Sequence, residues 1–301
     1  MTEYVAKPCL FCPGGACFEE LYPRNFRDED LNPAVFSARR VTEHFHYRMV
    51  RCRETGLVFS REVLPDAVLE KLYAESRVTF NAYAGIIRSD YWKPFAPFAA
   101  EAERGAALEI GCSTGFFLEE LLDRGYREVH GCEPSAEARR LASPRVAGAI
   151  LGGLFSDSAF PDALFDLVCS FQTLDHAGDP AALLAACYRK TRPGGLLYLI
   201  AHDAESLQAR LFGEKSPIID VEHIYLFNRK TLPLAAARAG YRPLSVFPIR
   251  NSYPLQYWIT HAPIPFRRAI ARAAEATGLG RLRLPLGLGN IGMVARKPPK
   301  G

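Results

Sequence analysis

The segment 106–125 constrains the fold more than any other part of this chain of 301 residues. The short apolar run 106–110 predicts a buried strand, and the apolar residues of 116–122 recur at helical spacing. Between these two runs, Gly111 and Gly115 allow a sharp turn and keep the space above it free of side chains. We therefore expect a strand, a turn and a helix that bind a ligand at the unpaired N–H groups of the helix N-terminus.

The turn by itself is typical of two unrelated kinds of site. Gly-x-Ser-x-Gly also surrounds the nucleophile of serine hydrolases, in which Ser113 would act with His176 or His223. The residues that follow favour a nucleotide site instead, because a second strand, 128–132, leads into Glu133. A carboxylate about twenty residues beyond the first glycine is where nucleotide-binding α/β folds bind the ribose hydroxyls.

Strand and helix patterns alternate from residue 107 onward, which predicts a parallel sheet wound with helices. The expected strands are 107–110, 128–132, 146–150, 165–170, 196–201, 242–247 and 290–296. The expected helices are 116–124, 135–142, 180–191 and 231–239. The sequence thus predicts an α/β fold around one sheet of seven strands.

Five segments together resemble the motifs of the class I S-adenosylmethionine-dependent methyltransferases. They are the first motif at 108–115, the acidic second motif at 131–135, the fourth strand at 165–168, the loop after it at 174–180, and the turn at 192–195. The resemblance covers most of residues 70–300. It implies a Rossmann-like seven-stranded sheet with helices on both faces, and S-adenosylmethionine as the cofactor.

The resemblance also implies which residues bind that cofactor. Glu133 would bind both ribose hydroxyls, Gly153 and Leu154 would contact adenine, and Gln172 would lie beside the reacting methyl group. The whole implied set is Glu109, Gly111, Ser113, Gly115, Phe116, Glu133, Pro134, Gly153, Leu154 and Gln172. Glu109 and Gly111 would lie beside the methionine part of the cofactor.

A general base is required only if the acceptor must lose a proton. The polar candidates follow the fourth and fifth strands, at the edge of the sheet where ligands bind: His176, His202, Asp203 and the run 222–225. We predict that His223 is the base and that Tyr225 helps to position the acceptor. His176 is also expected to shape the cofactor pocket.

The N-terminal cysteines suggest a metal site. Cys9 and Cys12 have the spacing of a zinc knuckle, whereas the second knuckle begins at Cys52 and has Thr55 where its last cysteine would be. The layout resembles the zinc-ribbon N-terminus of a methyltransferase branch that includes sugar C-methyltransferases. Zinc needs four ligands. Cys17, His44 or His46 could complete the set, and the alternative is a metal-free remnant of a ribbon.

The chain is expected to divide into a small β-rich lobe at 1–62, a helical linker at 63–104 and a methyltransferase domain at 105–301. An insertion at about 250–289 is rich in aromatic residues and arginines. Three roles for it remain open: a lid over the acceptor, a surface for a homodimer, or a basic amphipathic helix on a membrane or an anionic glycan.

The charge and hydropathy of the chain bear on whether it binds nucleic acid or spans a membrane. The formal net charge of +4 is small and spread out, so it gives no electrostatic case for nucleic acid. No apolar run is long enough to cross a bilayer and the N-terminus does not resemble a signal peptide, so we expect a cytoplasmic protein. The leading hypothesis is methyl transfer to carbon, oxygen or nitrogen of a small-molecule or glycan acceptor. The alternatives are the serine hydrolase and a non-catalytic methyltransferase scaffold.

Overall fold

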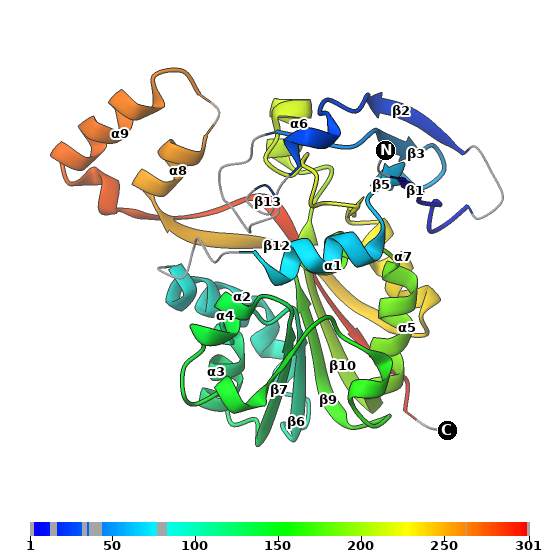
Figure 1. Ribbon diagram of the computed structural model, residues 1–301. Coiled ribbons are helices and arrows are strands. Elements are labelled where there is room, and N and C mark those ends of the chain that lie inside the picture. The colour runs from blue at the N-terminus through cyan, green and yellow to red at the C-terminus, as the bar shows by residue number, and fades with distance from the viewer. Residues whose placement is uncertain are drawn as a thin grey trace.

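The computed structural model describes residues 3–12, 17–31, 35, 44–76, 83–262 and 264–299. Its central element is a seven-stranded sheet in the order β12-β13-β10-β9-β6-β7-β8 (Figure 1). The strands are β6 (Ala106–Ile110), β7 (Glu128–Glu133), β8 (Ile150–Gly152), β9 (Phe165–Phe171), β10 (Thr191–His202), β12 (Arg242–Pro254) and β13 (Arg283–Arg296). β13 runs antiparallel to β10 and β12, and the remaining pairs are parallel.

The predicted Rossmann-like sheet with its added β lobe is confirmed, with one local error. The strand expected at 146–150 begins only at Ile150, because residues 147–149 form a 3₁₀ turn first. The last two strands are also longer than expected. β12 and β13 remain paired as far as Pro254 and Arg283, so the helical part of the expected insertion is confined to 255–281.

Helices cover both faces of the sheet because successive residues of a strand point to opposite sides. In β10, Tyr198 packs against Phe95 and Phe117 on one face, with the Tyr198 and Phe95 ring centroids 4.8 Å apart. On the other face, Leu197 belongs to a core cluster that includes Leu184. Full burial of side chains of this size stabilises the fold by about 1.5–3 kcal/mol each.

The two helical layers lie on opposite sides of the sheet in Figure 1. The first comprises α2 (Ala84–Ala99) and α3 (Phe116–Asp123), followed along the chain by α4 (Ala136–Arg140). The second comprises α5 (Pro180–Lys190) and α7 (Thr231–Arg238). α2 lies in the segment expected to be a linker, yet its buried residues pack in the core of the sheet. It therefore belongs structurally to the large domain.

The N-terminal segment forms the small β-rich lobe. Its four-stranded sheet has the order β11-β4-β3-β2, and a two-stranded sheet pairs β1 with β5. The strands are β1 (Val5–Ala6), β2 (Phe18–Tyr22), β3 (Met49–Cys52), β4 (Val58–Ser60), β5 (Glu62–Val63) and β11 (Tyr225–Leu226). Because β11 comes from the middle of the chain, the lobe is joined to the large domain by sheet hydrogen bonds as well as by the backbone.

Three further helices border the carboxyl edge of the sheet. α1 (Asp66–Ala74) crosses above the strand ends, α6 (Leu207–Phe212) lies beside the small lobe, and α8 (Leu255–His261) continues from β12 (Figure 1). α8 is followed by α9 (Arg267–Ala276), which extends away from the sheet. Within the ranges that the structure describes, no helix has the length and apolar character needed to cross a membrane.

Candidate functional site

A cavity of about 760 Å³ lies at the carboxyl ends of the parallel strands. Its walls come from the ends of β6, β7, β9 and β10, from α1, and from β12 and α8. Open α/β sheets bind their ligands at this edge, because the loops that leave the strands diverge there. The cavity therefore lies where the sequence predicts the ligand.

The glycine-rich turn forms the floor of one end. Gly111 has φ +75°, and a Cβ there would lie 2.2 Å from Oγ1 of Thr173, so only glycine fits without displacing a neighbour. Gly115 has φ +73° and begins α3. The backbone between them is also left-handed at Ser113, whose φ is 49°. This tight turn directs the Ser113 N–H to the carboxylate at the end of the next strand.

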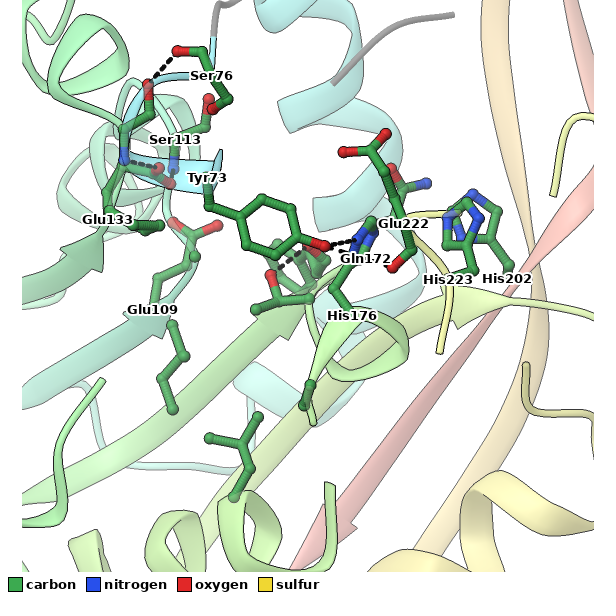
Figure 2. A pocket seen from close by; sticks show the side chains of 18 of the residues that line it. Tyr73, Ser76, Glu109, Ser113, Glu133, Gln172, His176, His202, Glu222 and His223 are labelled. Carbon is green, nitrogen blue, oxygen red and sulfur yellow. Dashed lines mark hydrogen bonds between the residues drawn. The ribbon is translucent and has the colours of Figure 1, made fainter. Parts of the chain in front are cut away.

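That carboxylate belongs to Glu133, the last residue of β7. It accepts the backbone N–H of Ser113 at 2.9 Å and of Ser135 at 2.8 Å (Figure 2). Ser135 then caps α4 by accepting the N–H of Ala138 at 3.2 Å. Two backbone donors thus hold the carboxylate in one orientation, with its remaining lone pairs available to hydroxyl groups of a ligand.

Glu109 lies beside Glu133 and is 1% exposed. Its Oε2 has no hydrogen-bond partner among the described residues. Burial, reinforced by the nearby charge of Glu133, raises the pKa of Glu109 well above its ordinary value. An unsatisfied buried carboxyl oxygen on a cavity wall is suited to a ligand with a positively charged group, such as an ammonium.

Most of the expected cofactor residues line this one cavity. They are Glu109, Gly111, Ser113, Phe116, Glu133, Pro134, Gly153, Leu154 and Gln172. Gly115 is not among the lining residues, because it lies one step further into the turn, where a Cβ would meet Val146 at 2.8 Å. Gln172 has φ 50°, and its backbone N–H donates to the carbonyl of Ile200.

The opposite end of the cavity contains three histidines (Figure 2). The ring centroid of His223 lies 4.7 Å from that of His176 and 4.3 Å from that of His202. His176 follows β9 and His202 ends β10, so parallel strands bring these two together. His223 comes from the long segment between β10 and β11.

Buried carboxylates fix these rings. Oδ2 of Asp175 lies 2.5 Å from Nδ1 of His202. Oδ1 of Asp220 lies 2.8 Å from Nδ1 of His223, although the ring is turned so that the contact is an ion pair rather than a well-directed hydrogen bond. On the side of the cluster that faces Glu133 in Figure 2, the hydroxyl of Tyr73 lies 3.2 Å from Nδ1 of His176.

The histidines differ in their affinity for protons. Burial, reinforced by the charge of His223, lowers the pKa of His176 to about 4, so this ring is neutral at pH 7. Burial alone would lower the pKa of His223, but the carboxylate of Asp220 outweighs it and raises the pKa to about 9. The residue predicted to be the base therefore already holds a proton at neutral pH.

Tyr225 does not join this cluster, which corrects its expected role. Its ring stacks on Phe59 of β4 with centroids 5.9 Å apart, and its hydroxyl donates to the carbonyl of Pro8 at 3.0 Å. Tyr225 is absent from the residues that line the cavity. It attaches the 220–226 segment to the small lobe.

Two residues beside the histidines, Tyr73 and Asp220, were not predicted from the sequence. Tyr73 lies in a helix that was expected to be a linker, and Asp220 carries no motif. The spacing of Asp220 and His223, three residues apart, is the one signal that could have indicated their contact.

Aromatic side chains and an amide also line the cavity. Tyr253, Tyr257 and Trp258 line the cavity from β12 and α8, with the Tyr253 and Tyr257 ring centroids 4.1 Å apart. Asn251 also lines it, and its buried Oδ1 has no hydrogen-bond partner in the described part of the chain. These residues combine flat aromatic surfaces with an unpartnered hydrogen-bond acceptor, an arrangement that favours a ligand with a hydroxyl or amine.

A second cluster lies in the small lobe, where the sulfurs of Cys9, Cys12, Cys17 and Cys52 all lie within 4.8 Å of one another. The sulfur of Cys52 is 3.7 Å from that of Cys12 and 3.8 Å from that of Cys17. Four thiolates at about 2.3 Å from a tetrahedral zinc ion lie about 3.8 Å apart. The residues present therefore fit zinc. Although Thr55 replaces the last cysteine of the second knuckle, four cysteines still come together in the structure.

The fourth member of this cluster is Cys17, and neither of the two histidine candidates belongs to it. His46 instead contacts the carbonyl of Tyr47 at 2.8 Å and Glu214 at 3.0 Å. Burial disfavours the Cys52 thiolate, but hydrogen bonds from Thr55 and the backbone outweigh it and lower the pKa of Cys52 to about 6. Thr55 thus stabilises a thiolate where a zinc knuckle would have a ligand.

Comparison with known proteins shows that this chain is similar to methyltransferases. The family model described as a methyltransferase domain matches residues 83–246. A probable S-adenosylmethionine-dependent methyltransferase of Mycolicibacterium smegmatis is 32% identical over 120 residues, which are 37% of this chain and 46% of that protein.

Two O-methyltransferases are similar over comparable lengths. The malonyl-acyl-carrier-protein O-methyltransferase of Serratia marcescens is 32% identical over 49% of this chain and 57% of its own length. The ubiquinone biosynthesis O-methyltransferase of Psychrobacter arcticus is 30% identical over 40% of this chain and 48% of its own length. The chain spans about half the length of the curated relatives it matches.

Proposed function

This chain belongs to the family of methyltransferase domains, and we propose that it transfers a methyl group from S-adenosylmethionine to a small-molecule or glycan acceptor. One observation carries the proposal. A carboxylate oriented by two backbone N–H groups, Glu133, lies at the carboxyl edge of the sheet beside a left-handed glycine turn. This combination suits the ribose hydroxyls of a nucleoside cofactor.

The donor would extend from Glu133 toward Gln172. Glu133 would bind the ribose, Gly153 and Leu154 would contact adenine, and Glu109 would lie near the methionine end. The unpartnered Oε2 of Glu109 supports that direction, because the methionine part carries an ammonium group that can donate to it. When bound, the sulfonium supplies an already activated methyl group, so the protein mainly aligns the acceptor and excludes water.

The acceptor would occupy the histidine end of the cavity. The aromatic side chains that line the cavity and the unpartnered Oδ1 of Asn251 support an acceptor with a ring or chain that carries a hydroxyl or amine. If that group loses a proton as it is methylated, His176 is the histidine suited to take it, since its pKa is lowered. His223, protonated by its pairing with Asp220, would stabilise negative charge on the acceptor.

The serine hydrolase alternative is weaker. Ser113 lies at the Glu133 end, and Tyr73 lies between it and the histidines (Figure 2). A hydrolase nucleophile needs its base within hydrogen-bond reach. The proposal for the small lobe is separate: the four cysteines bind one zinc ion, which closes the lobe as a structural site.

The test of the proposal is calorimetry of the full chain with S-adenosylmethionine and S-adenosylhomocysteine. We expect one binding site for each. Absence of binding to both would overturn the proposal. Labelling of Ser113 by a fluorophosphonate probe would favour the hydrolase instead.

A further inference from the structure

The histidine end of the cavity combines several imidazole and carboxylate groups, and both kinds of group bind metal ions. We propose that Asp175, His176 and His223 form a binding site for one divalent transition-metal ion. Each offers a ligand atom, and these atoms all lie within 4.8 Å of one another. Ligands on opposite sides of such an ion lie about 4.2 Å apart, because the bonds to imidazole and carboxylate are about 2.1 Å long. Closure around an ion therefore needs only small side-chain movements.

The carboxylate of Asp175 is oriented for this role. The residue is completely buried. Its Oδ2 lies 2.5 Å from Nδ1 of His202 and accepts the His202 backbone N–H at 3.2 Å. Its Oδ1 is buried and has no hydrogen-bond partner among the residues described. A buried carboxylate oxygen without a partner is costly, and a metal ion would satisfy it.

Each proposed histidine ligand also has a polar group beside one ring nitrogen, although at His223 this contact is an ion pair and not a directed hydrogen bond. The hydroxyl of Tyr73 lies 3.2 Å from Nδ1 of His176, and Oδ1 of Asp220 lies 2.8 Å from Nδ1 of His223. Metal-binding histidines are usually held in this way, with one nitrogen on a carboxylate, carbonyl or hydroxyl and the other on the ion. The contact with Tyr73 leaves Nε2 of His176 to bind the metal, whereas His223 can offer either ring nitrogen.

The charges of the cluster favour a dication. Asp175, Asp220 and Glu222 place three buried carboxyl groups around the histidines, and Asp220 and Glu222 line the cavity. Two imidazoles and one carboxylate suit manganese, iron, cobalt, nickel or zinc ions, whereas magnesium and calcium prefer oxygen ligands alone. This donor set also differs from the four thiolates of the small lobe, which select zinc.

Binding of the ion would displace the proton that His223 holds in the metal-free protein. An ion bound by three protein groups keeps open positions. His176 and His223 line the cavity, so these positions would face the acceptor. An acceptor oxygen bound there would ionise more easily through direct contact with the ion, in place of proton transfer to His176. This last step rests on the proposed methyl transfer, and it restricts the acceptor to molecules with a hydroxyl or another oxygen donor. Metal binding itself does not depend on it.

The test is a cobalt(II) titration of the full chain, dialysed against citrate and with zinc left in the cysteine cluster. We expect one cobalt ion per chain with the weak visible absorption of nitrogen and oxygen ligands. Asp175→Asn and His223→Gln should each weaken binding at least tenfold. His130→Gln, a histidine on β7 far from the cluster in the sequence and outside the cavity lining, should bind cobalt like the parent.

Equal cobalt affinity in the parent and in Asp175→Asn would overturn the site. So would binding that shows only the intense near-ultraviolet absorption of cobalt thiolates, because the ion would then be in the cysteine cluster. Thermal unfolding of the same samples reports whether each variant is folded, and calorimetry with S-adenosylmethionine reports separately on cofactor binding. Cobalt binding without cofactor binding would refute the proposed methyl transfer and leave the metal site standing.

Discussion

Glu133→Gln is the substitution that most directly tests the cofactor site. The change keeps the size of the side chain, removes its charge and replaces one carboxylate oxygen by an NH₂ group. In the parent, both oxygens already accept backbone N–H groups, from Ser113 and Ser135. The new NH₂ group must face one of these donors, so one bond is lost and the side chain presents fewer acceptors to the ribose.

The magnitude follows from those contacts. A hydrogen bond to a charged group contributes about 1.5–3 kcal/mol. Loss of one such bond to a ribose hydroxyl would weaken S-adenosylmethionine binding roughly 10- to 150-fold, since each 1.4 kcal/mol is a factor of ten. Loss of one bond to the turn should lower the free energy of unfolding by about 1–3 kcal/mol.

The assay is calorimetry for the cofactor together with thermal unfolding of the apo protein. Glu128→Gln is the matched control, because it is the same change on the same strand at a side chain that is 68% exposed. The control should bind the cofactor like the parent. If folded Glu133→Gln binds S-adenosylmethionine within twofold of the parent, Glu133 does not bind the ribose and the assignment of this end of the cavity is wrong.

Three other predictions concern the turn, the lobe and the alternative enzyme. Gly111→Ala should lower the unfolding temperature more than Gly125→Ala does. Both residues have positive φ, but only at Gly111 would the new Cβ clash with a neighbour. Equal shifts in unfolding temperature would show that the turn has room for a Cβ. Cys17→Ser should reduce the zinc content measured by mass spectrometry from one ion per chain to less than half, while His46→Gln retains it; the reverse pattern would make His46 the ligand. Ser113→Ala should keep at least a third of the parent methyl transfer, and complete loss would return the serine to a catalytic role.

The sequence predicted residues that line the Glu133 end of the cavity, because that end is built from local chain geometry. Gly111 must be glycine since its φ is +75°, and Glu133 ends β7, whose pairing with β6 places it beside the turn. A single βαβ unit brings these residues together. The glycine turn and Glu133 can therefore be predicted from the sequence of this one segment.

The histidine end depends on contacts that no short motif encodes. Tyr73 reaches His176 across 103 residues, and the 220–223 loop is fixed by its own Asp220 rather than by a regular element. Tyr225 follows that loop and looked equally suited to the site, but strand pairing turned it toward the lobe. Long-range packing therefore determines that His223 lines the cavity and Tyr225 does not. Their positions two residues apart in the sequence do not distinguish them.

The small lobe is connected to the histidine end of the cavity through strand pairing. Cys52 ends β3, β3 pairs with β4, and β4 pairs with β11, which directly follows the histidine loop. Ser60 at the end of β4 also donates to the carbonyl of His223 at 3.1 Å. A metal ion that closes the four cysteines would therefore stiffen the strand against which His223 rests. In this arrangement the lobe holds the histidine end in register with the cofactor turn, and its influence should appear in acceptor turnover rather than in cofactor affinity.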